Sequence, residues 1–71
     1  MSENYKCFIR ELKRVMAINN MTPSIAAEYM KVSKATFYNW LGFKTVMSGD
    51  DMIRVIDVLM GGRYEKFGTL S

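Results

Sequence analysis

Histidine is absent from the 71 residues, and Cys7 is the single cysteine. Without histidine the chain has no nucleophile–histidine pair for covalent catalysis, and the usual zinc sites cannot be built. A lone cysteine also leaves no partner for an internal disulfide, which makes a reducing compartment the natural expectation. The sequence therefore predicts a cytoplasmic protein that is not an enzyme and that binds no metal or other cofactor.

Long apolar runs and glycine-rich phosphate loops are missing too. No stretch approaches the roughly 20 apolar residues that span a bilayer, and no signal-peptide pattern opens the chain. Asp50 and Asp51 are adjacent carboxylates, but neighbours on a helix point apart, so a helix start explains them better than acid–base chemistry. We therefore expect no membrane contact and no small-molecule substrate.

Acidic residues are missing between Glu28 and Asp50, an interval that contains Lys31, Lys34 and Lys44. The whole chain has a net charge of +3, from 10 basic and 7 acidic residues. A balance of this size permits a polyanionic partner without requiring one. The local excess of lysine in this interval is more informative than the net charge of the whole chain. It indicates where a polyanionic partner is expected to bind.

What is present is an ordinary globular composition, 49% hydrophobic and 24% charged. A chain of 71 residues forms one domain, residues 1–71, near the lower limit for an independent core, and a homodimer would ease that limit. Helical spacing of the apolar residues predicts an all-α domain of four or five helices. In residues 63–71 the spacing suits a short helix and an extended arm equally well, and this tail packs back on the domain or meets a second subunit.

Hydroxyl residues mark three expected helix starts. Thr22 precedes Pro23, Ser33 follows closely on the preceding helix, and Ser48 precedes a first turn that contains two acids. The expected helix ends are Asn19-Asn20, Gly42 and Gly61-Gly62. Two short helices joined by a tight turn are thus predicted between about residues 22 and 41.

The expected core consists of apolar side chains that recur three and four residues apart. They are Tyr5, Phe8, Ile9, Leu12, Val15, Met16, Ala27, Met30, Val32, Phe37, Trp40, Met52, Ile53, Val55, Ile56, Leu59 and Met60. Lys6, Arg10, Lys13 and Arg14 fall largely on the other side of the first helix, where a solvated face is favoured over phosphate contact. The seven methionines are read as gap-fillers of a small core rather than as an adaptable binding surface.

Residues 27–40, AEYMKVSKATFYNW, resemble the helix-turn-helix of the Cro/C1-type phage repressor family. The similarity includes Ala27, the Val32-Ser33 turn, the Ala35-Thr36 pair, and the core positions Phe37 and Trp40. It implies a lambda-repressor-like fold. At the turn position where the family usually has glycine, this chain has Lys31, which must adopt a left-handed conformation at a cost of about 1 kcal/mol.

The resemblance implies a transcriptional regulator, most plausibly a phage or mobile-element repressor that binds double-stranded DNA as a homodimer. Helix 33–41 is then expected to enter the major groove of a palindromic operator. Lys44 and Thr45 in the following loop are candidate phosphate contacts, with a solvated loop as the equal alternative. The predicted DNA-binding residues are Ser33, Lys34, Ala35, Thr36, Tyr38, Asn39, Lys44 and Thr45.

Two other functions stay open from the sequence. A recombination accessory or excisionase-like factor would also bind DNA but would bend it. A protein-binding module, such as an inhibitor of a host protein, could use the same helices as a scaffold, since a motif specifies fold more closely than partner. The operator sequence and the sign of regulation are left undetermined by the sequence.

Overall fold

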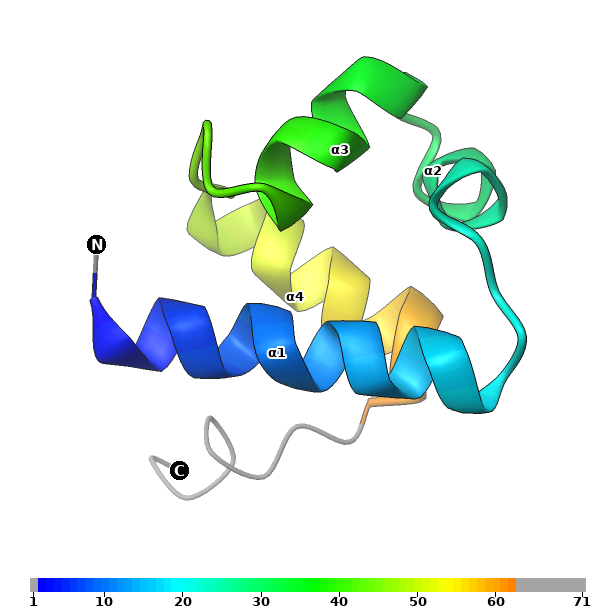
Figure 1. Ribbon diagram of the computed structural model, residues 1–71, viewed down its shortest axis with the longest axis horizontal. Helices are drawn as coiled ribbons and strands as arrows, with labels where there is room; N and C mark the ends of the chain where they lie inside the picture. Colours follow the sequence, from blue (N-terminus) through cyan, green and yellow to red (C-terminus); the bar gives the residue numbers. More distant parts are fainter. Residues whose placement is uncertain (1, 63–71) are drawn as a thin grey trace.

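The computed structural model describes residues 2–62, which form four α-helices (Figure 1). They are α1 (Glu3–Ile18), α2 (Pro23–Met30), α3 (Lys34–Leu41) and α4 (Gly49–Leu59). No strand occurs between residues 2 and 62, so the predicted all-α class is confirmed for this part of the chain. The helix or arm predicted for residues 63–71 lies outside the described residues.

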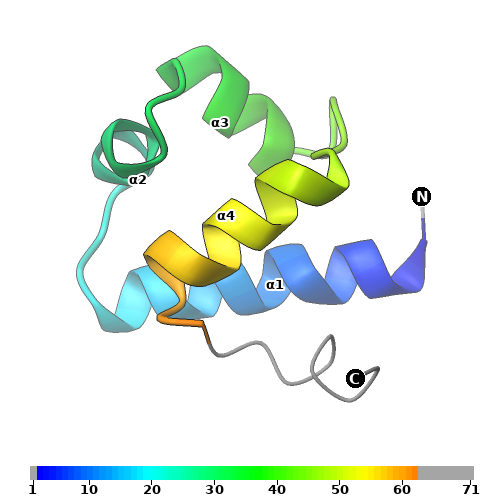
Figure 2. The same ribbon diagram turned by 180° about the vertical axis from the view of Figure 1, so that it is seen from behind.

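The four helices form one small assembly in which α2 and α4 each pack against two others. α4 packs against α1 and α2, and α2 also packs against α3. Figure 2 shows α4 crossing α1, with α2 and α3 together on one side of that pair. None of the helices within residues 2–62 is long and apolar enough to cross a membrane.

Each helix begins after a hydroxyl residue whose oxygen accepts a hydrogen bond from the backbone N–H three residues later. Thr22, Ser33 and Ser48 do so at 3.2, 3.1 and 3.1 Å, and Pro23 is the first residue of α2. Ser2 caps α1 in the same way at 3.2 Å, a start that the sequence pattern did not single out. Because such a cap contributes about 1 kcal/mol, these residues fix where the helices begin. The three predicted starts are confirmed.

The helix ends also follow local signals. Asn20, just after α1, has a φ of 54°, and Lys31, just after α2, has a φ of 58°. Gly42 is the C-cap of α3, and Gly61 and Gly62 follow α4 with φ values of 62° and 77°. The predicted stops and the left-handed conformation of Lys31 are therefore confirmed.

The core contains nearly all of the expected apolar residues. Its buried members are Tyr5, Phe8, Ile9, Leu12, Met16, Ala26, Ala27, Met30, Phe37, Trp40, Met47, Val55, Leu59 and Met60. Met21 and Met52 are partly buried against this cluster, so all six methionines between residues 2 and 62 fill the core, as predicted.

One expected core residue is exposed. The sequence pattern assigned Ile53 to the apolar surface of α4, but its side chain is 65% exposed. Val55, two residues later, is fully buried. Two residues correspond to about 200° around a helix, so these two side chains point in nearly opposite directions, and the prediction for Ile53 was wrong.

Candidate nucleic-acid interface

The candidate interface begins with the connection between α2 and α3, which is only three residues long, residues 31–33. The N–H groups of Lys31 and Val32 donate to the carbonyls of Glu28 and Ala27, each at 3.1 Å. These bonds satisfy the free carbonyls at the end of α2 while Lys31 turns the chain through its left-handed conformation. The turn therefore fixes the direction in which α3 leaves α2.

One side of α3 is anchored in the core. Phe37 is fully buried and Trp40 is 5% exposed, and their rings meet edge to face with centroids 5.8 Å apart. Ala27 of α2 is also buried and, being small, permits close packing between the two helices. The predicted shared core of α2 and α3 is thus present.

The opposite side of α3 is open to solvent. Lys34, Ala35 and Tyr38 are exposed, and Asn39 is half-buried. These positions lie on one face because residues four apart are neighbours on a helix. The structure therefore brings together four of the predicted DNA-binding residues on a single face, away from Phe37 and Trp40.

Ser33 and Thr36 are occupied with each other at the start of α3. The Ser33 hydroxyl accepts from the Thr36 N–H at 3.1 Å and donates to Thr36 Oγ1 at 2.9 Å. The two hydroxyls are thus bonded to each other, and the Ser33 oxygen also caps the helix.

The loop after α3 is tied back to the last turn of that helix. The N–H groups of Lys44 and Thr45 both donate to the Asn39 carbonyl, at 2.9 and 3.4 Å. Phe43 has a φ of 62°, an uncommon conformation for an aromatic residue, and its N–H donates to the Trp40 carbonyl at 3.3 Å. Lys44 and Thr45 are exposed, and their backbone is held at the last turn of α3.

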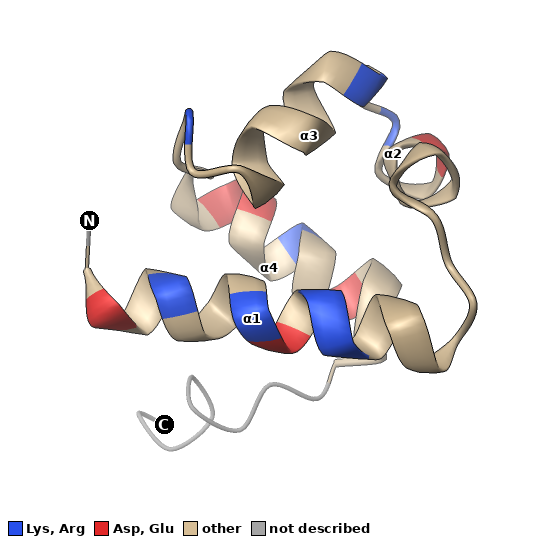
Figure 3. Ribbon diagram, viewed as in Figure 1, with Lys and Arg blue, Asp and Glu red and all other residues tan. Residues whose placement is uncertain are grey.

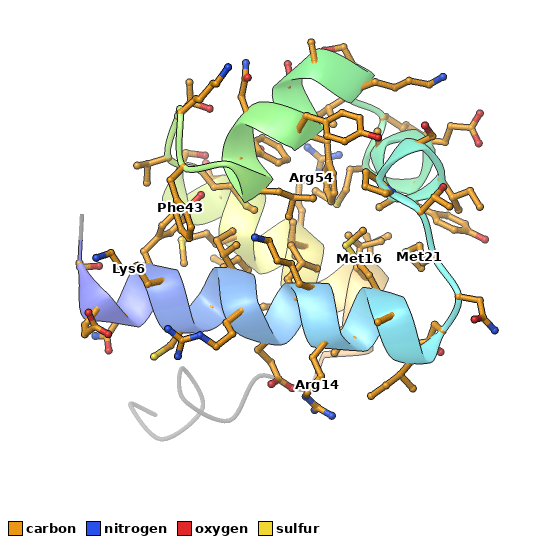
Figure 4. The ribbon with its side chains drawn as sticks, viewed as in Figure 1. Lys6, Arg14, Met16, Met21, Phe43 and Arg54 are labelled. Carbon is orange, nitrogen blue, oxygen red and sulfur yellow. The ribbon has the colours of Figure 1, made fainter. Side chains whose placement is uncertain are left out.

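Sequence reasoning missed Arg54, which lies on α4. Its Nη2 donates to the Met30 carbonyl at 2.6 Å, and its Nη1 lies 3.7 Å from Asp51 Oδ1. Figure 4 shows Arg54 reaching from α4 into the space between α2 and α3. Arg54 thereby ties α4 to the last residue of α2, immediately before the turn. The partners are 24 residues apart, so no local sequence pattern indicates the contact.

The turn before α3, α3 itself and the loop after it contain basic but no acidic residues. Figure 3 shows lysine at the start of α3, in the turn before it and in the loop after it, whereas acidic residues lie on α1, α2 and α4. Between residues 2 and 62 the structure has two ion pairs, Arg14–Glu11 and Arg54–Asp51, and neither includes a lysine. The lysines of the acid-free interval therefore have no acidic side chain of the described region to neutralise them.

No cluster of residues in the described part of the chain could hold a metal ion, since no three His, Cys, Asp or Glu side chains come together there. Comparison of the whole chain with protein-family models, with curated proteins and with solved structures finds no match. Function must therefore be inferred from the residues themselves.

Proposed function

We propose that this protein is a sequence-specific regulator of transcription with a lambda-repressor-like helix-turn-helix, and that α3 enters the major groove of duplex DNA. The observation that carries the proposal is that α3 has one buried apolar face and one exposed polar face. Phe37 and Trp40 fasten one side to the core, while Lys34, Tyr38 and Asn39 project from the other within a stretch that has no acidic residue. A major groove admits one α-helix, and base edges are read by side chains of these types.

Each exposed residue of α3 has a base or group that it suits. Lys34 can donate to the acceptors of guanine, and the Asn39 carboxamide can pair with both hydrogen-bonding groups of adenine. Ala35 offers a methyl group that suits the thymine methyl, and Tyr38 offers a hydroxyl together with an apolar ring. Thr36 has a hydroxyl in the first turn of α3, which suits a phosphate or the methyl group and edge of a thymine.

The loop after α3 supplies the contacts that fix the protein on the backbone. Lys44 carries a compact charge on a flexible stem, which suits a phosphate rather than a base edge. Because the Lys44 and Thr45 N–H groups bond to the Asn39 carbonyl, a phosphate held by the loop sets the position of Asn39 in the groove. Two copies on a palindromic operator, most plausibly in a phage or mobile element, complete the proposal.

The proposal is tested by separating base readout from phosphate contact. Duplexes are first selected from a random pool with the wild-type protein, and Asn39→Ala and Lys44→Ala are then titrated against the selected duplex, a single-base variant and an unrelated duplex. We expect Asn39→Ala to cost about 1–3 kcal/mol on the selected duplex and to relax preference at one position. Lys44→Ala should weaken binding to all three duplexes alike and lower the salt slope by about 1 per protomer.

The outcomes separate the parts of the proposal. If Asn39→Ala weakens binding to all three duplexes equally, base readout by Asn39 is wrong. If no duplex is enriched by the wild-type protein, or if binding is insensitive to salt, the proposed DNA-binding function is wrong as a whole.

A second candidate function has one observation in its favour. Ile25 and Tyr29 are 40% and 59% exposed, and because they are four residues apart on α2 they form one apolar patch on its outer face. They favour the protein-binding alternative, in which the outer face of α2 contacts another protein. Tyr29→Ala separates the two functions, because it leaves duplex binding unchanged if α3 reads DNA through its own exposed face.

A further inference from the structure

Three basic residues form a stripe along one flank of α1. Lys6, Arg10 and Lys13 are spaced by four and three residues, which places them on one side of the helix, and all three are exposed. At a rise of about 1.5 Å per residue, Lys6 and Lys13 are separated by roughly 10 Å along the helix axis. No acidic side chain of the described region forms an ion pair with any of the three. We call these three residues the α1 stripe.

The α1 stripe borders the loop after α3. The Lys13 ammonium lies 5.6 Å from the centre of the Phe43 ring, and the Tyr5 ring meets Phe43 edge on at 6.3 Å. The Tyr5 hydroxyl also accepts the Met47 N–H at 3.1 Å, so the end of the loop is bonded to the core side of α1, next to the stripe. Figure 4 shows Lys6 and Phe43 on the same side of α1, which is the side facing α3.

Arg14, the fourth basic residue of α1, differs from the stripe residues because it is paired with an acidic side chain. It makes two hydrogen bonds to Glu11, at 3.0 and 2.5 Å, and is thereby paired within its own helix. In Figure 4 it projects from the side of α1 opposite to Phe43. Lys13 and Arg14 are thus adjacent in sequence and equal in charge, but they differ in surroundings and direction.

We infer that the α1 stripe, together with Lys44, is a second contact to the phosphate backbone of a DNA duplex, outside the groove that α3 occupies. This inference rests on the proposed function, because it places the backbone of the same duplex beside the loop. Lys44 directly follows Phe43, whose ring holds the Lys13 ammonium near the loop. A lysine held in this way loses less side-chain freedom when it meets a phosphate. The contact is independent of base sequence and adds affinity rather than specificity.

The adjacent pair Lys13 and Arg14 provides a matched test, since each substitution by glutamine removes one positive charge from an exposed position. Binding of wild-type protein, Lys13→Gln, Arg14→Gln and the double variant Lys6→Gln/Lys13→Gln is measured over a series of salt concentrations. The selected duplex and an unrelated duplex are used in parallel. Each phosphate contact contributes about 0.9 to the slope of log K against log salt.

We expect Lys13→Gln to make that slope shallower by about 0.9 per protomer on both duplexes, and the double variant by about twice as much. Arg14→Gln should leave the slope unchanged. Equal slopes for Lys13→Gln and Arg14→Gln overturn the inference while leaving specific binding by α3 in place. Failure of the wild-type protein to enrich any duplex overturns the proposed function together with the inference, and binding to anionic vesicles alone would then identify a lipid surface as the partner of the stripe.

Discussion

Tyr5 joins the N-terminal helix to the end of the loop after α3. Its side chain is 4% exposed, and its hydroxyl accepts the N–H of Met47, a residue 42 positions later in the chain. The same ring contacts Phe43 near the beginning of that loop. A single side chain therefore fixes the loop that carries Lys44 and Thr45, so part of the geometry of the proposed interface depends on a residue that touches no ligand.

Tyr5→Phe should destabilise the domain by about 1–3 kcal/mol, because the buried N–H of Met47 loses its acceptor. The pH dependence supplies a second signature. Burial raises the pKa of Tyr5 above the ordinary value of 10.0, and the hydrogen bond from Met47 offsets this in part. With the higher pKa in the folded state, the contribution of Tyr5 is complete below about pH 10 and is lost as the pH rises through the folded pKa.

Denaturant unfolding of wild-type and Tyr5→Phe protein at pH 8 and pH 11 measures both effects. The difference between the two proteins should be largest at pH 8 and smaller at pH 11, since only the wild type loses stability through this phenol. A difference that stays constant across this range would show that Tyr5 does not titrate differently in the folded and unfolded states.

At the scale of the elements, the two faces of α3 have different roles: one packs in the core and the other is exposed. Trp40→Ala should cost about 3–5 kcal/mol, because it empties a buried site beside Phe37. A loss of this size is comparable to the whole stability that a chain this short can have. Tyr38 is 53% exposed, so Tyr38→Ala should leave the fold largely intact. Thermal melts of the two variants decide the matter, and equal losses would mean that the faces of α3 have been assigned the wrong way round.

The turn between α2 and α3 stores a small amount of strain at Lys31, whose φ is 58°. Lys31→Gly should relieve it, whereas Lys31→Ala should retain it, and both variants lose the same charge. Glycine loses more backbone entropy on folding, and this offsets part of the relief of strain. We therefore expect Lys31→Gly to be the more stable of the two by about 0.5–1 kcal/mol. Melting curves of the two variants under identical conditions measure this difference. A higher melting temperature for Lys31→Ala would contradict the assigned turn conformation.

Local signals explain which elements could be predicted from the sequence. The starts at Thr22, Ser33 and Ser48 depend on a hydroxyl and its own backbone three residues later, so they are visible in any short window. The left-handed conformation of Lys31 was expected from the resemblance to the Cro/C1-type family, in which glycine usually holds this turn position. Burial of Phe37 and Trp40 followed from their spacing alone, and the exposed residues of α3 followed from that assignment by elimination.

The contacts that could not be predicted are those between distant segments. Arg54 reaches Met30 and Tyr5 reaches Met47 across 24 and 42 residues, and each depends on how α4 and α1 cross the other helices. The placement of Phe43 could not be predicted either, because its ring contacts Tyr5 and Lys13 of α1, which are distant in the sequence. Ile53 was assigned wrongly since an apolar residue at the edge of a helical stripe gives no sign of which way it faces.

At the scale of the whole molecule, its dimensions bear on how it would occupy an operator. The Cα trace extends 31 × 25 × 19 Å along its principal axes. Half-sites of a palindromic operator are spaced by one helical turn of DNA, about 34 Å from centre to centre. In the proposed complex one copy of this domain would cover one half-site, and with the longest axis along the duplex two copies on adjacent half-sites would come close enough to touch. The proposed homodimer is compatible with these dimensions, whichever residues form its interface.

The spacing of half-sites then becomes a test of the dimer. Two half-sites centred about 10 base pairs apart should bind two copies cooperatively and more tightly than an isolated half-site. Insertion of about 5 base pairs turns the second half-site to the opposite face of the duplex, so the gain should disappear although every base contact of α3 is still available. Insertion of a full turn restores the face but puts the centres about 68 Å apart, more than twice the longest dimension of the domain, so cooperativity should stay absent. Titrations of the four duplexes, read by the stoichiometry and steepness of binding, distinguish a dimer from independent monomers. Equal affinity per half-site at every spacing would disprove the homodimer, and it would leave base readout by α3 as a property of the single chain.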